Sequence, residues 1–239
     1  MIKLAVTGCQ GRMGQRITHL ALEDDAFTVQ TLLEHKDHPK VNEKINDIII
    51  STSVDALKGN DVIIDFTTPE STLANIEACV SHGVKMVIGT TGFTPEQIDT
   101  IHKAAETIPI VFASNMSIGV NILFKLAQTL AQVAPDMYKV TMTEAHHIHK
   151  KDAPSGTAKT LAEHVEQNSS HKVENIESIR EGEIIGDHKV FFESPEDIIT
   201  IDHHAKNRDI FAKGSLVAAK FLTNKEKGLF NMQDVLGLN

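Results

Sequence analysis

The chain has 239 residues, of which 41% are hydrophobic and 23% are charged, and its formal net charge is −9. That length is enough for one large domain or two small ones with a true hydrophobic core. The negative charge, the absence of tryptophan and the single tyrosine argue against a protein that wraps nucleic acid or docks on anionic lipid.

Cysteine usage and the first residues indicate a location. Cys9 and Cys79 form no CxxC pair, so reduced thiols in a cytosol are the simplest interpretation. The opening MIKLAVTG runs directly into a glycine-rich turn, without the apolar core and cleavage site of a signal peptide. No apolar run approaches the length of a membrane span. We therefore expect a cytoplasmic protein.

Strands and helices alternate at short intervals in the first half of the chain. Apolar runs predict strands at 2–7, 27–33, 61–66, 84–88 and 109–113. Helical spacing, twice with a proline near the first turn, predicts helices at 12–22, 69–82 and 95–106. Gly83 lies just past the end of the second. This alternation predicts an α/β domain with a doubly wound parallel sheet and right-handed crossovers.

The pattern changes after about Ser117. We predict helices at 120–133, 157–167 and 211–222, and strands at 138–144, 175–180, 183–192 and 197–203. Consecutive strands without helices between them indicate an antiparallel or mixed sheet. The sequence therefore predicts a second domain, of the α+β type.

A glycine-rich turn, GCQGRMG at residues 8–14, lies between the first predicted strand and helix. Glycine permits a tight turn, and a helix N-terminus offers free N–H groups to a pyrophosphate. The spacing is G-x-x-G-x-x-G, not the commoner G-x-G-x-x-G, so a turn without a ligand is an alternative. Glu34 ends the next strand 20 residues after Gly14, where an acid accepts from adenosine ribose hydroxyls.

The residues after Glu34 bear on the choice of cofactor. His35 and Lys36 can meet a 2′-phosphate, whereas Glu34 suits a free 2′-hydroxyl, so we expect tolerance of both NADH and NADPH. Two ordinary surface residues are the alternative. The loops GTTGF (89–93) and ASNMS (113–117) each follow a predicted strand. They are expected to face the nicotinamide half of a cofactor, because ligands of parallel sheets bind beyond the strand carboxyl ends; either loop could instead be a simple connector.

The segment EAHHIHKKDAPSGT (144–157) collects three histidines and two lysines in an otherwise acidic chain. A metal site is disfavoured because no HExxH motif is present and an extended segment points alternate residues apart. A solvated basic loop is a second alternative. The third interpretation is an anion site, in which Ser155 or a neighbour caps a helix, the amides of Gly156 and Thr157 point outward, and neighbouring cations bind carboxylates. A dicarboxylate substrate would explain the whole cluster.

These motifs together resemble a known family. GCQGRMG, DFTTPE, GTTGF, SNMSIGVN and EAHHIHKKDAPSGTA, in this order and spacing, resemble the dihydrodipicolinate reductases, through FAKGSLVAAKFL near the C-terminus. The resemblance implies NADH- or NADPH-dependent reduction of 4-hydroxy-tetrahydrodipicolinate to tetrahydrodipicolinate, with loss of water, in the diaminopimelate and lysine pathway. It also implies a homotetramer. The implied domains are a discontinuous Rossmann-like dinucleotide-binding domain (1–117 and 209–239) and a substrate-binding and oligomerisation domain (118–208).

The resemblance further implies roles for individual residues. His146 would be the proton donor and acceptor and Lys150 the second proton donor. The substrate carboxylate would be held by His147, Gly156 and Thr157. The residues expected to bind the cofactor are Gly8, Cys9, Gln10, Gly11, Arg12, Met13, Glu34, His35, Gly89, Thr90, Thr91, Ala113, Ser114, Asn115 and Met116. No metal is expected.

Overall fold

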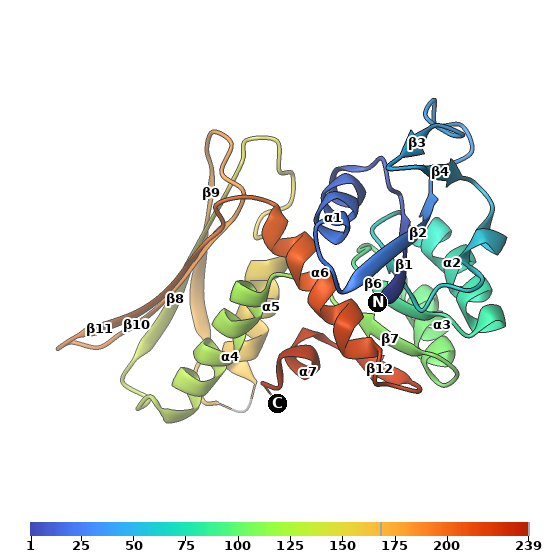
Figure 1. Cartoon of the computed structure of the whole chain (residues 1–239). Helices are drawn as coiled ribbons and strands as arrows, with labels where there is room; N and C mark the ends of the chain where they lie inside the picture. Colours follow the sequence, from blue (N-terminus) through green and yellow to red (C-terminus); the bar gives the residue numbers. More distant parts are fainter. Residues whose placement is uncertain (168, 239) are drawn as a thin grey trace. The chain divides into compact units, whose positions relative to one another are not determined.

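The computed structural model describes residues 1–167 and 169–238. The chain forms two compact units (Figure 1). Unit 1 comprises Met1–Ser117 and Phe211–Gly237, and unit 2 comprises Ile118–Ile210. Each unit has its own sheet and hydrophobic core. No helix in the described part of the chain is long and apolar enough to cross a bilayer.

Unit 1 is built on an eight-stranded sheet with the order β12-β7-β6-β5-β1-β2-β4-β3. Neighbouring strands are parallel, except for the antiparallel pair β3–β4. The strands are β1 (Ile2–Thr7), β2 (Phe27–Leu33), β3 (Lys44–Ile45), β4 (Ile48–Ser51), β5 (Val62–Asp65), β6 (Lys85–Ile88), β7 (Pro109–Phe112) and β12 (Gly228–Phe230). The predicted Rossmann-like parallel sheet is confirmed.

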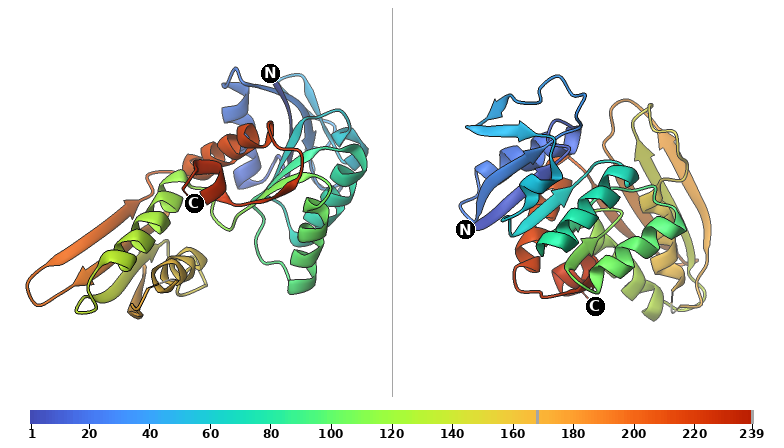
Figure 2. Two further views of the ribbon diagram at one scale, coloured as in Figure 1. Left: turned by 90° about the horizontal axis from the view of Figure 1, so that it is seen from below. Right: turned by 90° about the vertical axis from the view of Figure 1, so that its right-hand side faces the viewer.

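Helices cover both faces of this sheet. They are α1 (Arg12–Leu22), α2 (Pro69–His82), α3 (Pro95–Ala105), α6 (Asp209–Leu222) and α7 (Met232–Leu236), with a 3₁₀ turn at Val54–Leu57. Figures 1 and 2 show α2 and α3 on one face and α1 and α6 on the other. Lys85 of β6 donates to the carbonyls of Leu222 and Thr223 at 2.9 and 2.6 Å. This contact joins the end of helix α6 to the sheet.

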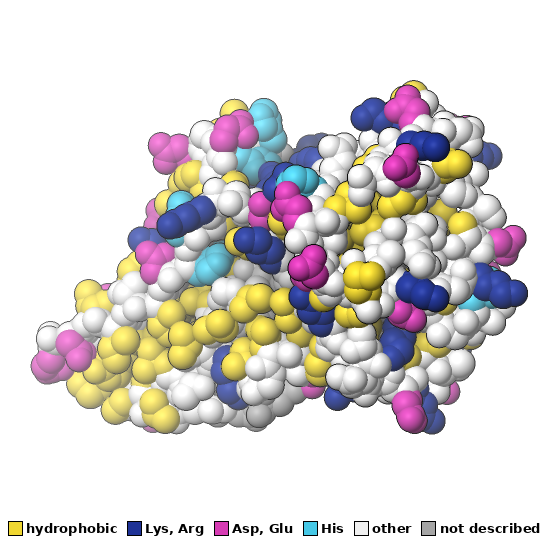
Figure 3. Space-filling view, viewed as in Figure 1, with side chains coloured by type: hydrophobic (Ala, Val, Ile, Leu, Met, Phe, Trp, Pro, Cys, Tyr) yellow, Lys and Arg dark blue, Asp and Glu magenta, His cyan; other side chains and the backbone are white. Residues whose placement is uncertain are grey.

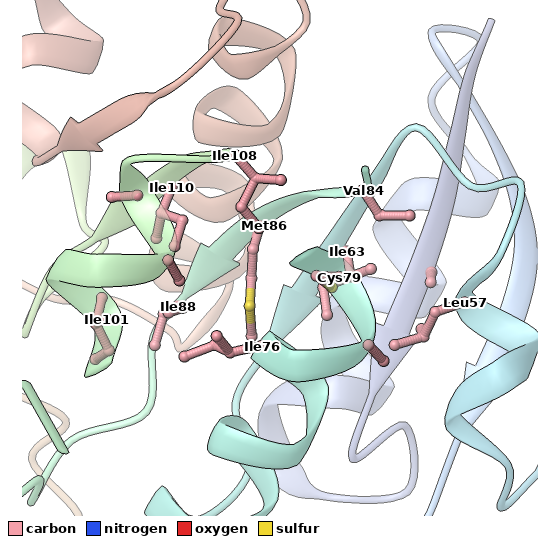
Figure 4. Packing of buried hydrophobic residues seen from close by; sticks show 14 of the residues in the cluster. Leu57, Ile63, Ile76, Cys79, Val84, Met86, Ile88, Ile101, Ile108 and Ile110 are labelled. Carbon is pink, nitrogen blue, oxygen red and sulfur yellow. The ribbon is translucent and has the colours of Figure 1, made fainter. Parts of the chain in front are cut away.

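The core under α2 and α3 shows why these elements form where they do. Leu57, Ile63, Ile76, Met86 and Ile101 are among its members (Figure 4) and are at most 2% exposed. Burial of each such side chain stabilises the fold by about 1.5–3 kcal/mol relative to exposure. Helix α2 begins at a proline and ends at a left-handed glycine, as the sequence predicts, and a threonine is its N-cap.

Unit 2 has a four-stranded sheet with the order β11-β10-β8-β9. Its strands are β8 (Lys139–His146), β9 (Val173–Arg180), β10 (Asp187–Glu193) and β11 (Ile198–His204). The pair β8–β9 is parallel and the other pairs are antiparallel, so the predicted mixed sheet is confirmed. Helices α4 (Ile118–Val133) and α5 (Gly156–Glu166) pack on one face, over a core that includes Phe124, Leu161 and Phe192.

Two predicted boundaries in unit 2 were wrong in a way that matters for the site. Strand β10 begins at Asp187 and not at residue 183, because Gly182 adopts φ 49° in a turn over residues 181–184 and residues 184–186 have no regular structure. Strand β8 continues beyond Glu144 to His146, since Ala145 pairs with Asp187 and His146 with Arg180. His146 therefore lies on a strand and not in the following loop.

Candidate active site

The glycine-rich turn of unit 1 joins β1 to α1. Gly8 adopts φ 63°, a conformation that other residues rarely take. A Cβ on Gly14 would lie 2.0 Å from the carbonyl oxygen of Gly8, so the helix can start this close to the turn only with glycine there. Gly11 is the N-cap of α1 and has no side-chain cap, and Arg12 and Met13 form the first turn. The turn therefore has the geometry of an anion site at a helix N-terminus.

A cavity of about 730 Å³ lies beside this turn. Such a volume is typical of cofactor sites. Of the residues predicted to bind cofactor, the lining includes Gly8, Gly11, Glu34 and His35. The carboxylate of Glu34 accepts from the backbone N–H of Gln10 at 2.8 Å and of His35 at 2.9 Å. Glu34 is thus held in one orientation, facing the cavity from the end of β2.

Cys9 has a different place from its neighbours in the turn. Its side chain is fully buried, and burial raises the pKa of its thiol to about 11. The thiol therefore packs in the core as a small apolar group. Only the backbone of Cys9 is available to a ligand at the turn.

The loop after β6 is tied to the end of β5 by a buried carboxylate, Asp65. One oxygen of Asp65 accepts from the hydroxyls of Thr67, Thr72 and Thr90 at 2.7, 3.1 and 3.0 Å. The other accepts from Asn75 at 2.7 Å. Among the residues predicted to bind cofactor, Thr90 is buried and Thr91 is exposed.

Close packing also fixes Gly89 in this loop. A Cβ there would lie 2.2 Å from the ring of Phe66, so only glycine fits without a shift. The loop after β7 has a similar close contact. Met116 is 1% exposed, and a Cβ on Gly214 of α6 would lie 1.7 Å from the carbonyl oxygen of Met116. Ala113 donates to Ile88 at 3.3 Å, and Asn115 accepts from Ser117 at 2.9 Å, whereas Ser114 is exposed.

The candidate catalytic histidine lies in unit 2, at the end of β8. The side chain of His146 is 10% exposed, and its Nδ1 is 2.5 Å from Oε2 of Glu144. Glu144 is fully buried and forms a bidentate pair with Arg180, at 3.0 and 2.7 Å. The ring of His188 on β10 contacts the His146 ring edge-to-face, with centroids 5.2 Å apart. These groups form one connected cluster on the helix-covered side of the sheet.

Protonation within this cluster is set by burial and charge together. Burial alone would raise the pKa of Glu144, but hydrogen bonds, with that from Arg180 the largest, bring the pKa down to about 2. Burial lowers the pKa of His146, and Glu144 opposes that effect. Burial lowers the pKa of His188 to about 3. Near neutral pH the cluster therefore holds a carboxylate, a guanidinium and a neutral His188.

The N-terminus of α5 lies directly beside the cluster. Ser155 is the N-cap and accepts from Ala158 N–H at 3.1 Å, which confirms the predicted cap. Its own N–H donates to Glu144 at 3.2 Å, and its hydroxyl is 3.4 Å from Nε2 of His188. Gly156 is exposed and Thr157 is half-buried in the first turn of α5. The positive end of the helix dipole can bind an anionic ligand, and the neighbouring imidazole can exchange a proton with that ligand.

Lys150 and His147 lie in the segment between β8 and α5. Nζ of Lys150 is 2.8 Å from Oδ1 of Asp152, and this contact lowers the pKa of that carboxyl. The Nδ1 atom of His147 is buried and has no hydrogen-bond partner among residues 1–167 and 169–238. Within the same residues, no group of three or more His, Cys, Asp or Glu side chains is arranged to hold a metal ion.

Family models match almost the whole chain. The N-terminal model of dihydrodipicolinate reductase matches residues 2–116, and the C-terminal model matches residues 119–236. The chain belongs to the dihydrodipicolinate reductase family. Two relatives named 4-hydroxy-tetrahydrodipicolinate reductase support this. The protein of Nitrosomonas europaea is 40% identical over 264 residues, covering 99% of this chain and 98% of its own. That of Syntrophotalea carbinolica is 41% identical over 266 residues and covers both chains fully.

A solved structure agrees with the family. The dipicolinate-bound dihydrodipicolinate reductase from Paenisporosarcina sp. TG-14 has a TM-score of 0.81 with 26% identity, covering 98% of each chain. An amine dehydrogenase from Mycobacterium smegmatis has a TM-score of 0.71 with 8% identity and covers 97% of this chain and 95% of its own, so the likeness is one of fold alone.

Several residues of this candidate site are absent from the sequence predictions. Glu144 ends a predicted strand, but its contact with Arg180, 36 residues away, depends on the pairing of β9 with β8. Its contact with His146, two residues away, depends on both side chains lying on the same face of β8. His188 was placed only within a predicted strand. Asp65 gives a local signal, since an acid that ends the otherwise apolar run VIID is unusual for a buried strand.

Proposed function

We propose that this chain reduces 4-hydroxy-tetrahydrodipicolinate to tetrahydrodipicolinate with loss of water, using NADH or NADPH, in diaminopimelate and lysine biosynthesis. The observation that carries the proposal is the cluster at the end of β8, where His146, held by buried Glu144, lies beside the capped N-terminus of α5. Relatives that are about 40% identical over their full length are named 4-hydroxy-tetrahydrodipicolinate reductase.

The cofactor fits unit 1 on three observations. The Gly8–Gly14 turn has the close backbone packing that a pyrophosphate site requires, Glu34 is fixed beside a cavity of suitable volume, and Asp65 anchors the loop of Gly89–Thr91. The bound nicotinamide supplies a hydride, which adds two electrons to the substrate ring. We infer that the adenosine ribose hydroxyls donate to Glu34. His35 and Lys36 line the same cavity and are available to a 2′-phosphate.

The substrate has two carboxylates, and unit 2 offers groups that attract them. The amides of Gly156 and Thr157 lie in the first turn of α5, where the helix dipole favours an anion. His147 has a buried nitrogen that a carboxylate can meet. Lys150 is paired with Asp152, so a substrate carboxylate would have to compete for its ammonium group. The related structure from Paenisporosarcina is described as dipicolinate-bound, which supports a small dicarboxylate.

Proton transfer would belong to His146 and Lys150. Lys150 gives a proton to the departing ring hydroxyl, and the neighbouring ring carbon releases one, so that water leaves without net uptake of a proton. After the hydride has added, Nε2 of His146 gives one proton to the resulting enamine carbon. One hydride and one proton are therefore consumed in each turnover. Burial lowers the pKa of His146, so its imidazolium releases the proton readily near neutral pH.

We infer that the two parts of the chain divide these tasks, with a cofactor domain at residues 1–117 and 209–239 and a substrate and oligomerisation domain at 118–208. We also infer a homotetramer. The sheet face of unit 2 away from α4 and α5 carries half-buried Phe191 and Ile198, which is 57% exposed. Hydrophobic side chains also gather over α4 (Figure 3), where Leu126 is 50% and Val133 is 72% exposed. Sedimentation at four times the chain mass of 26.2 kDa would support the tetramer, and sedimentation at a single chain mass would refute it.

A coupled assay tests the proposed activity. The cyclic substrate is generated freshly in the cuvette, and the oxidation of NADH and then of NADPH is followed by absorbance. Steady consumption of reduced cofactor that depends on the substrate supports the proposal. Binding of NADH without turnover would refute it and would indicate a regulator that senses NADH. Turnover of other dicarboxylates at equal rates would indicate a different reductase.

A further inference from the structure

Glu144 is the most heavily bonded side chain around His146. It is 1% exposed and accepts from Nδ1 of His146, from both terminal nitrogens of Arg180 and from the N–H of Ser155. Four donors to one buried carboxylate satisfy its lone pairs and hold it ionised. Because an ionised carboxylate only accepts, the nitrogen of His146 that faces it must be the one that bears a proton.

Arg180 is fixed as firmly as Glu144. Besides the bidentate pair, its guanidinium donates to the carbonyls of Ile179 at 2.7 Å and Asp152 at 2.5 Å. Strand pairing sets the geometry, because Arg180 is the register partner of His146 on β9. A guanidinium in this position neutralises part of the charge of Glu144 and so weakens the hold of Glu144 on an imidazolium.

The other nitrogen of His146 faces a residue without a side chain. A Cβ on Gly186 would lie 3.2 Å from Nε2. That distance is tighter than ordinary van der Waals contact, so any larger residue would press on this atom. Gly186 has an ordinary backbone conformation, so its lack of a side chain matters here for space and not for φ.

We propose that Glu144 and Arg180 are a pair of positioning residues for His146, in which Glu144 keeps Nδ1 protonated so that Nε2 exchanges the proton, and Arg180 keeps the imidazolium acidic enough to release it. This inference rests on the proposed function, because it gives His146 a proton to deliver. The charged and titratable groups around the ring are Glu144 on β8, Lys150 in the segment between β8 and α5, Arg180 on β9 and His188 on β10.

Glu144 and Arg180 have opposite effects on the pKa of His146, and this difference provides the test. Glu144→Gln removes the negative charge and leaves Arg180, so the pKa of His146 falls. Arg180→Met removes the positive charge and leaves Glu144, so the pKa rises. A charge at this range shifts a pKa by about 1–3. The pH dependence of kcat/KM reports pKa values of the free enzyme. The midpoint of its high-pH limb should therefore shift to lower pH in Glu144→Gln and to higher pH in Arg180→Met.

The expected loss of kcat in Glu144→Gln also has an upper limit. Glu144→Gln should lower kcat by less than the loss of about 10²–10⁴-fold expected on removing His146 itself, since the proton donor is still present. Glu177→Gln is the matched control, because Glu177 is an exposed residue of β9, and it should leave both rate and limb unchanged. Circular dichroism and NADH binding check that each variant is folded.

Two results would overturn the inference. If both variants moved the limb in the same direction, or lowered kcat without moving it, the pair would have a structural role only.

The second readout needs no turnover. Nitrogen-15 chemical shifts of His146 in the unsubstituted protein should show a proton on Nδ1 in the neutral ring, and a proton on Nε2 would contradict the proposal. An inactive parent enzyme with the Nδ1 tautomer would instead refute the proposed function alone.

Discussion

Replacing His188 with glutamine should make the protein less sensitive to acid. Burial lowers the pKa of His188 from its usual 6.5 to about 3 in the folded protein. Above about pH 6.5 the ring is neutral in both states. Between about pH 6.5 and 3 the unfolded chain binds a proton that the folded chain excludes, so stability is lost as the pH falls. Below about pH 3 both states bind it.

The size of the effect follows from these two pKa values. Integrating the difference in bound protons from about pH 7 to about pH 5 gives a loss of about 2 kcal/mol from His188 alone. Burial also lowers the pKa of His146, His164 and His203, so they add to the acid sensitivity of the parent. They are present in the His188→Gln variant as well. The difference in slope between parent and variant therefore isolates His188.

The assay uses the one tyrosine of the chain. Tyr138 lies in unit 2 and there is no tryptophan, so intrinsic fluorescence during urea unfolding reports on that unit. The free energy of unfolding is measured from about pH 7 to about pH 5 for the parent, His188→Gln and the control His149→Gln, whose histidine side chain is 72% exposed. Equal pH dependence in His188→Gln and the parent would refute the reasoning, as would an equal change in both variants.

Three further substitutions test the sites. His146→Gln should lower kcat by about 10²–10⁴-fold with little change in NADH affinity, and near-normal turnover would remove His146 from the mechanism. Glu34→Ala should weaken NADH binding by roughly 10- to 100-fold, and NADPH binding less, because it removes a charged hydrogen-bond acceptor; equal losses in calorimetric titrations would argue against a ribose contact. Asp65→Asn should cost about 1.5–3 kcal/mol of stability and weaken NADH binding, because the loop of Thr90 loses its anchor. Asp61→Asn, directly before β5, is its control, since Asp61 accepts from the exposed N–H of Lys3, and equal effects of the two changes would contradict that role of Asp65.

The sequence predicted the elements that carry their own boundary signals. Helix α2 was expected at its observed limits, because Pro69 and Gly83 mark its ends whatever the tertiary context. The short strands β3 and β12 were missed, since two or three residues carry no periodicity and are strands only through their partners. Strand β4 was also missed, although its apolar run III resembles those of the predicted strands. The apolar pair at 184–185 led to the wrong start for β10, although it lies in an irregular stretch between a turn and the strand.

The candidate site shows the same division. Ser155 was predicted as a cap because capping is a local property of four residues. The partners of His146 were not predicted, because Arg180 and His188 reach it through the pairing of β9 and β10 with β8. A one-residue change of register would turn each of these side chains to the other face of the sheet. The charged residues of the segment 144–157 could therefore be found by inspection of the sequence, but their hydrogen-bond and ion-pair partners could not.

The most direct test of the account is a crystal structure of the chain with dipicolinate bound. The account predicts one carboxylate within hydrogen-bond distance of the amides of Gly156 and Thr157, and a ring carbon facing Nε2 of His146. Both acid groups bound away from the start of α5, with His146 and Lys150 facing solvent, would contradict it.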